Sequence, residues 1–292
     1  MKITQRQLFA VFTLLVLGSI QIFFLDKSFG SGTESHAPVA VSYQFNHEHT
    51  MWDRVLKRFV IVEGPASYVD YGTLKRNRRD FDLYVGSLET VTGSEFSGLS
   101  EQERLAFLIN AYNAITIKLI LDNYPVASIK DIKVPFNLKN PTRSPWKYEF
   151  FRLFMEDRTL DDIEHGIVRK KFNEPRIHFA LVCASKGCPA LKNEAFVADR
   201  LNEQLEDAAR TFLKDKTRNR FEPTEKTLYL SSIFKWYGSD FEKNGGSIKG
   251  FVSSRMAATP EEAKAIRDPS VKIKFLDYDW SLNDKKPVEG TK

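Results

Sequence analysis

The pattern of hydrophobic and polar positions predicts one long helix in the middle of the chain. Residues 105–121 are apolar on nearly every side, which is typical of a helix that is buried all round. Ser100 precedes this run and Glu103 follows three positions later, the arrangement of a capping box. Pro125 ends the pattern, because proline cannot continue a helix. We therefore predict a buried helix over residues 100–123.

Shorter amphipathic and alternating segments lie on both sides of this helix. Apolar residues at helical spacing predict helices, and these are residues 50–59, 74–88, 159–172, 198–214, 247–255 and 260–267. Alternation predicts strands, and these are residues 67–71, 148–155 and 271–278, with a hairpin over 220–230. This mixture predicts an α+β fold, a helix-rich single domain with a small, mainly antiparallel sheet.

The first residues have the pattern of an export signal. Lys2 and Arg6 precede a mainly apolar stretch over residues 8–25 that contains no charged residue, a basic region followed by a hydrophobic one. The stretch is long enough to span a bilayer. We expect a signal peptide or signal anchor over residues 1–25, with the membrane as a partner through residues 8–25 if the segment is not cleaved. The rest of the chain is then exported, to the periplasmic or extracellular face.

The remaining boundaries follow from composition. Gly, Ser, His and Pro without periodicity predict a linker over residues 26–48, followed by a globular domain over 49–284 and a polar tail over 285–292. The net charge of +5 comes from 43 basic and 38 acidic residues, so the sequence favours no nucleic-acid partner. No glycine-rich phosphate loop, G-x-S-x-G or H-E-x-x-H motif is present, and no cofactor is expected.

The candidate chemistry is concentrated in Arg176–Leu191, RIHFALVCASKGCPAL, which holds both cysteines of the chain. Its apolar run over residues 177–182 predicts a short buried strand. The chain then turns after Cys183 and reaches Cys188 followed by Pro189, where the spacing favours the start of a helix. An exported protein can join two such cysteines in a disulfide. The C-x-x-C spacing of thioredoxin-like redox sites is absent.

One hypothesis is a thiol-dependent hydrolase or transferase that acts on an amide or ester of the cell envelope, in a peptide or protein. Cys183 would be the nucleophile, and a histidine would take its proton. The side chains that could orient the imidazole are Asn113, Asn110 and Glu164. The amides of residues 184–187 could form an oxyanion hole. Cys188 at a helix start is the second candidate nucleophile, because a helix N-terminus stabilises a thiolate.

The two candidate histidines differ in how well their positions in the sequence suit a base for Cys183. On an extended strand His178 and Cys183 would lie roughly 16 Å apart, which favours a core role for His178. His165, on a separate helix, is the better expected partner for Cys183. A metal site built from both histidines and a cysteine matches no known zinc spacing, so none is expected.

The competing hypothesis is a noncatalytic binding or scaffold module. Cys183 and Cys188 would then form a structural disulfide, and the asparagines of the long helix would hold a neighbouring loop in place through their amides. Arg169 and Arg176 would either support that loop or bind an anionic ligand through two hydrogen bonds.

Four blocks of the sequence resemble a known family. LAFLINAYNAITI, DIEHGIVR, PRIHFALVCASKGCPAL and TLYLSSIFKWYGSDF, in this order, are similar to the "domain of unknown function 547" over roughly residues 50–255. The resemblance implies an export signal before the domain, as in bacterial members. Plant members join the domain to a coiled coil, typically have Ser at the position of Cys188 and keep a cysteine at that of Cys183. The resemblance therefore implies that a disulfide is not general to the family, and it implies no activity.

Overall fold

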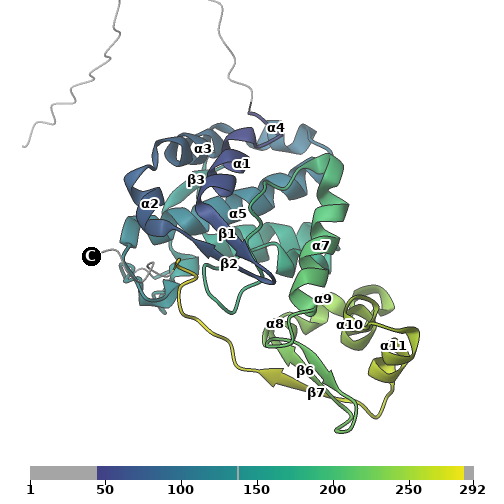
Figure 1. The fold of residues 1–292 in the computed structure, drawn as a ribbon. Helices are drawn as coiled ribbons and strands as arrows, with labels where there is room; N and C mark the ends of the chain where they lie inside the picture. The colour runs from purple at the N-terminus through teal and green to yellow at the C-terminus, as the bar shows by residue number, and fades with distance from the viewer. Residues whose placement is uncertain (1–44, 137, 286–292) are drawn as a thin grey trace, which may run out of the picture. The chain divides into compact units, whose positions relative to one another are not determined.

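The long helix α5, Glu101–Asn123, forms the centre of the fold as the sequence predicts. In this computed structural model, which describes residues 45–136 and 138–285, Ser100 Oγ accepts the amide of Glu103 and the Glu103 side chain accepts the amide of Ser100. The helix is long and apolar enough to cross a membrane by composition, yet it is buried within the protein. Figure 1 shows it with other helices and short strands around it.

The other elements are short. Before α5 lie α1 (Thr50–Phe59), β1 (Val60–Glu63), β2 (Ala66–Val69), α2 (Tyr71–Arg76), α3 (Arg79–Thr90) and α4 (Gly93–Gly98). After it come β3 (Phe151–Leu153), β4 (Glu156–Arg158), a π-helix (Asp162–Val168), α6 (Arg169–Lys171) and a 3-10 helix (Pro175–Phe179). The last part contains α7 (Leu201–Leu213), β5 (Arg220–Glu222), β6 (Thr227–Ser231), α8 (Ile233–Trp236), α9 (Gly238–Phe241), α10 (Ile248–Met256), α11 (Pro260–Arg267) and β7 (Lys272–Leu276). Single 3-10 turns occupy Ile129–Asp131, Pro145–Lys147, Ala198–Arg200 and Lys243–Gly245.

The strands form three small sheets. β1 pairs with β2 and β3 with β4, both antiparallel. β6 lies between β5, which is antiparallel to it, and β7, which is parallel. The α+β class and the mainly antiparallel pairing are therefore confirmed. The predicted signal segment (1–25), most of the linker (26–48) and nearly all of the tail (285–292) lie outside the described residues.

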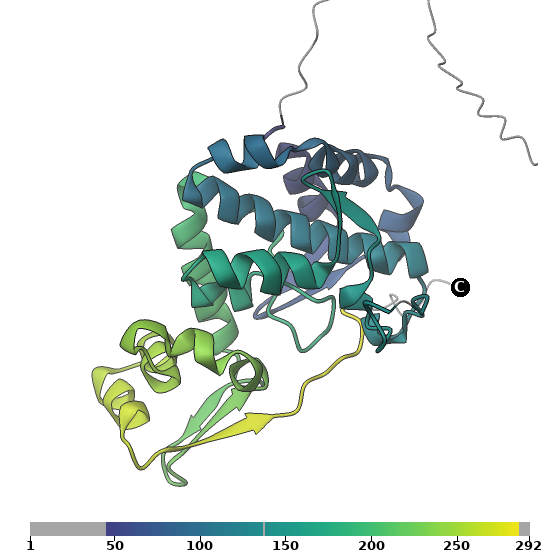
Figure 2. The same ribbon diagram turned by 180° about the vertical axis from the view of Figure 1, so that it is seen from behind.

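Two hydrophobic clusters stabilise the described part of the chain. The larger surrounds α5, and the smaller joins α7, α10 and the three-stranded sheet. After β7 the chain returns from the smaller cluster to the larger one, where Leu282 is buried. This C-terminal segment, residues 277–285, appears in yellow in Figures 1 and 2. It brings Tyr278 and Trp280 to the turn over residues 183–188, which we call the cysteine turn.

Three local predictions are wrong. The single helix over 74–88 is two helices, because the Asn77 side chain and amide both bond to the Thr73 carbonyl and end α2. Residues 177–182 are not a strand but a 3-10 helix and a turn, since Pro175 starts the helix and Glu174 caps it. A short apolar run cannot distinguish these cases by periodicity alone. No helix starts at Cys188; residues 188–197 are irregular.

Candidate functional site

A single cavity brings together both thiols and both candidate histidines. Its volume is about 270 Å³. The lining residues come from α5, the 3-10 turn Pro145–Lys147, the π-helix, the 3-10 helix Pro175–Phe179, the turn over residues 183–188, α8, the C-terminal segment and residues next to these elements. They are Tyr112, Ser144, Trp146, Asp161, Glu164, His165, His178, Leu181, Cys183, Cys188, Pro189, Ile233, Trp236, Tyr237, Tyr278 and Trp280. A concave site of this kind, with thiols and titratable groups in its wall, is the default place to look for function.

The cysteine turn is held by the C-terminal segment. Lys186 N donates to the Ser281 carbonyl and Gly187 N to the Asp279 carbonyl, both at 2.8 Å. A Cβ atom at Gly187 would lie 3.0 Å from the Asp279 backbone, so this close approach requires glycine. Ala184 has a φ of 59°, a strained left-handed conformation for alanine. The amides of Lys186 and Gly187 already donate to protein carbonyls, so they are not available to bind the oxyanion that residues 184–187 were expected to stabilise.

Cys188 Sγ lies among hydrogen-bond donors. It accepts the Cys183 amide at 3.0 Å and the Tyr278 hydroxyl at 3.1 Å, and it lies 3.3 Å from Ser185 Oγ. Burial alone would raise the pKa of Cys188, but hydrogen bonds from the Cys183 thiol, the Ser185 hydroxyl and the Tyr278 hydroxyl favour the thiolate and lower the pKa to about 6. These contacts favour Cys188 over Cys183 as the thiol that loses its proton. The source of the lowered pKa is this ring of donors, where the sequence suggested a helix N-terminus.

Cys183 is the more accessible but less acidic thiol. Its Sγ lies 3.3 Å from the Tyr278 hydroxyl and 3.4 Å from Ser185 Oγ. The hydrogen bond with Cys188, together with burial, raises the pKa of Cys183 well above its usual range. Both cysteines are free thiols in the structure. The contacts thus reverse the order expected from the sequence, because Cys188 and not Cys183 has the lowered pKa.

His178 is both buried and part of the cavity wall. Its Nε2 lies 2.8 Å from Asp240 Oδ2, and its ring stacks on Tyr237 with centroids 4.0 Å apart. Burial lowers the pKa of His178, which keeps the imidazole neutral near pH 7. Burial would raise the pKa of Asp240, yet its hydrogen bonds with His178, Arg169 and Lys243 lower it. The separation based on an extended strand does not apply, since the chain bends here.

His165 and Glu164 lie on the π-helix, a rare element that often occurs at functional sites. His165 Nδ1 is 3.1 Å from Arg169 Nη1, and its Nε2 is 3.5 Å from Asp161. Glu164 is buried and accepts the Tyr112 hydroxyl at 3.0 Å. Both side chains line the cavity, but the carboxylate contact of His165 is longer than that of His178.

The two asparagines bind backbone. Asn110 bonds to the amide and carbonyl of Phe196, and Asn113 to the Val182 amide and the Ala180 carbonyl. Neither lines the cavity. These contacts match the alternative in which the asparagine amides hold a neighbouring loop in place. The side chain that contacts a histidine ring, as the asparagines were expected to do, is Asp240 at His178.

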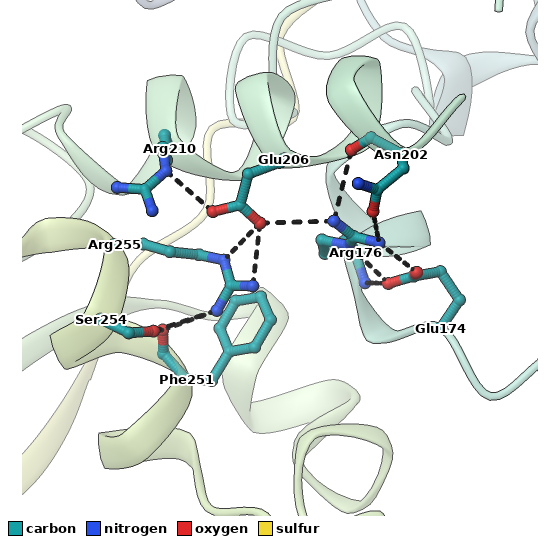
Figure 3. Close-up of polar contacts among 8 residues, drawn as sticks. All are labelled: Glu174, Arg176, Asn202, Glu206, Arg210, Phe251, Ser254 and Arg255. Atoms are coloured by element: carbon teal, nitrogen blue, oxygen red, sulfur yellow. Dashed lines mark hydrogen bonds and ion pairs between the residues drawn. The ribbon is translucent and has the colours of Figure 1, made fainter. Parts of the chain in front are cut away.

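The two arginines bind protein carboxylates. Arg169 Nε donates to Asp240 Oδ2 at 2.6 Å. Figure 3 shows Arg176 in a network with Glu174, Asn202 and Glu206. Arg176 is not among the residues that line the cavity. The guanidinium of Arg176 therefore has protein partners in place of the anionic ligand considered above. In the part of the chain that the structure describes, no group of three or more His, Cys, Asp and Glu side chains is arranged to hold a metal ion.

A comparison with protein families matches the part of the chain that contains both cysteines and both candidate histidines. Residues 96–213 match a family model described as "Protein of unknown function, DUF547". The resemblance to DUF547 is confirmed. No curated protein and no solved structure matches the chain. The DUF547 match includes both cysteines, Glu164, His165 and His178, whereas Asp240 and the C-terminal segment lie beyond it.

Several residues of the site were not found from the sequence. They are Tyr112, Asp161, Ser185, Trp236, Tyr237, Asp240, Tyr278 and Trp280. The block TLYLSSIFKWYGSDF contains three of them, but it lies beyond residues 96–213, which match DUF547. Tyr278 and Trp280 belong to DYDW, which has no motif or periodicity that connects it to a cysteine turn far away in the sequence.

Proposed function

We propose that this protein is a thiol-dependent acyl-transfer enzyme, a hydrolase or transferase that acts on an amide or ester. The observation that carries the proposal is the Cys188 sulfur in the wall of a cavity, where it accepts the Cys183 amide and the Tyr278 hydroxyl and has its pKa lowered to about 6. A thiolate is the nucleophilic form of cysteine, and a thiol with a lowered pKa is a candidate for function. Cys188 is only 4% exposed, and that exposed part lines the cavity. The predicted export signal makes an envelope peptide or protein the proposed source of the substrate.

The proposed base is His178, oriented by Asp240. In the cysteine enzymes of papain type, a third group holds the imidazole that serves the thiol. His178 meets this requirement at 2.8 Å from Asp240 Oδ2. With the Nε2 proton directed at Asp240, the lone pair of Nδ1 is available, and Nδ1 has no hydrogen-bond partner among the described residues. His165, the partner expected from the sequence, takes second place because its carboxylate contact is 3.5 Å.

In the proposed cycle, His178 accepts the proton of the Cys188 thiol, and Asp240 stabilises the imidazolium. The Cys188 sulfur adds to the substrate carbonyl carbon, and the amine or alcohol leaves with the proton from His178. Water or an acceptor amine then gives a proton to the imidazole and cleaves the thioester. Cys183, which keeps its own proton, supports the charge on Cys188 through its amide and thiol.

The test is acylation by an activated ester such as a nitrophenyl ester. Intact mass should show one acyl group, and trypsin should place it on the peptide of residues 187–192, because cleavage after Lys186 separates the two cysteines. Cys188→Ser should abolish acylation, and the matched change Cys183→Ser should leave it measurable. His178→Gln should slow turnover by about 100-fold or more.

Two outcomes would contradict the proposal. Acylation that persists in Cys188→Ser and disappears in Cys183→Ser would move the nucleophile to Cys183. A Cys183–Cys188 disulfide in the exported protein that resists mild reductant, with no acylation, would favour the noncatalytic binding or scaffold module.

A further inference from the structure

Most of the remaining cavity wall is aromatic. Trp146, Trp236 and Trp280, three of the four tryptophans of the chain, line it. Trp280 lies 4.6 Å from the Tyr278 ring and 5.7 Å from both Trp146 and Trp236, measured between centroids. Tyr278 is the link to the chemistry, because its hydroxyl bonds to both sulfurs. A group that rests against this aromatic cluster is therefore next to the thiols.

The acidic side chains that line the cavity are not matched by Lys or Arg side chains in the described lining. Asp161 and Glu164 supply carboxylates and Cys188 a thiolate, whereas no Lys or Arg occurs among the described residues of the lining. Glu164 is only 7% exposed and bonds to the Tyr112 hydroxyl. Arg169 and His178 lie near enough for their charges to interact with it, but no Lys, Arg or His in the described part of the chain forms an ion pair with it. A buried carboxylate without an ion pair is costly, and a bound cation would compensate it.

We infer that the cavity recognises a substrate with a cationic ammonium group close to the acyl carbon that the thiolate attacks. Aromatic rings attract cations through their faces, and clustered rings with a carboxylate are the usual device for binding ammonium ligands. The Trp280 ring already shows this ability, since Lys130 Nζ lies 3.8 Å from its centroid. A cavity of about 270 Å³ is at the small end of ligand pockets, so it fits one head group.

The inference rests on the proposed function for the acyl group, but binding of the cation does not depend on thiol chemistry. A neutral sugar is the competing ligand, because tryptophan faces and carboxylates also bind sugars. Sugar sites usually add amide and guanidinium donors, and the described lining contains no Asn, Gln or Arg side chain. The observations therefore favour the cation.

The experiment is a fluorescence titration of the full chain with both cysteines replaced by serine. Trp52 is fully buried in the core, so changes in emission report on the three tryptophans of the cavity. The probe is choline, compared with its neutral analogue in which carbon replaces the nitrogen, with glucose, and with sodium chloride at equal ionic strength. Choline should quench with saturation and bind about tenfold more tightly than the neutral analogue.

Two variants locate the site, with affinity measured by calorimetry. Trp236→Leu, at a half-exposed position, should weaken choline binding about fivefold, and Glu164→Gln about tenfold. Phe136→Leu removes an exposed aromatic ring outside the cavity lining and should change nothing. Equal affinity for the neutral analogue, tighter binding of glucose, or no saturable quenching would overturn the inference.

The two proposals fail separately. Choline binding without acylation of Cys188 in the unmodified chain would refute the enzyme and keep the cation site. Acylation of Cys188 without choline binding would refute the cation site and keep the enzyme.

Discussion

The hydroxyl of Tyr278 provides the sharpest test of how the site holds its thiolate. It donates to Cys188 Sγ at 3.1 Å and, together with the Cys183 thiol and the Ser185 hydroxyl, favours the charged form. Tyr278→Phe removes this donor and leaves the ring that packs on Trp280. Because the hydrogen bond stabilises the thiolate and not the thiol, its loss must raise the pKa of Cys188.

The size of the shift follows from the strength of the bond. A hydrogen bond to a charged group contributes about 1.5–3 kcal/mol, and about 1.4 kcal/mol corresponds to one pKa unit. The pKa of Cys188, about 6 in the native protein, should therefore rise to about 7–8 in Tyr278→Phe. Above the new midpoint both proteins should react alike, and the difference should be largest near neutral pH.

The assay is the pH dependence of alkylation by iodoacetamide. Trypsin cleaves after Arg176, Lys186 and Lys192, so mass spectrometry measures Cys183 in the peptide 177–186 and Cys188 in the peptide 187–192. The matched control is Tyr229→Phe, whose hydroxyl donates to the exposed Glu225 instead. It should leave the Cys188 midpoint unchanged.

The reasoning would be refuted by either of two results. An unchanged Cys188 midpoint in Tyr278→Phe would show that the hydroxyl does not stabilise the thiolate. A midpoint near 6 for the peptide 177–186 in the native protein would place the acidic thiol at Cys183.

Three further variants test other parts of the structure by urea unfolding. Asp240→Asn should lower the free energy of unfolding by about 3 kcal/mol at pH 7. Because the folded state lowers the pKa of Asp240, the native protein should progressively lose this extra stability below about pH 4. A difference between the two proteins that stays constant down to pH 3 would count against the ion pairs. Ala184→Gly should stabilise the fold by about 0.5–1 kcal/mol by relieving the left-handed backbone, and destabilisation would contradict this. Glu206→Gln, in the network of Figure 3, should cost about 1 kcal/mol, less in high salt, and an effect independent of salt would argue against charge.

Local signals were sufficient for the regular elements. The capping box of Ser100 and Glu103 and the apolar run that follows predict α5, and the hairpin over 220–230 appears as β5 and β6. These predictions succeed because caps, turns and periodic patterns act between residues close in sequence. The prediction for 177–182 failed although Pro175 and Glu174 lie next to it, because a short apolar run fits a strand and a buried turn equally well. Asn113 from α5, far away in the sequence, then bonds the Ala180 carbonyl and the Val182 amide of the turn.

The sequence by itself determined that thiols and histidines occur in blocks that resemble DUF547, and that the core is α+β. Only the tertiary structure decided which thiol has the lowered pKa and which histidine has the closer carboxylate. Tyr278 lies 90 positions from Cys188, and Asp240 lies 62 positions from His178. A pKa depends on burial and on the donors around a group, and here those donors are supplied by chain segments that only folding brings together.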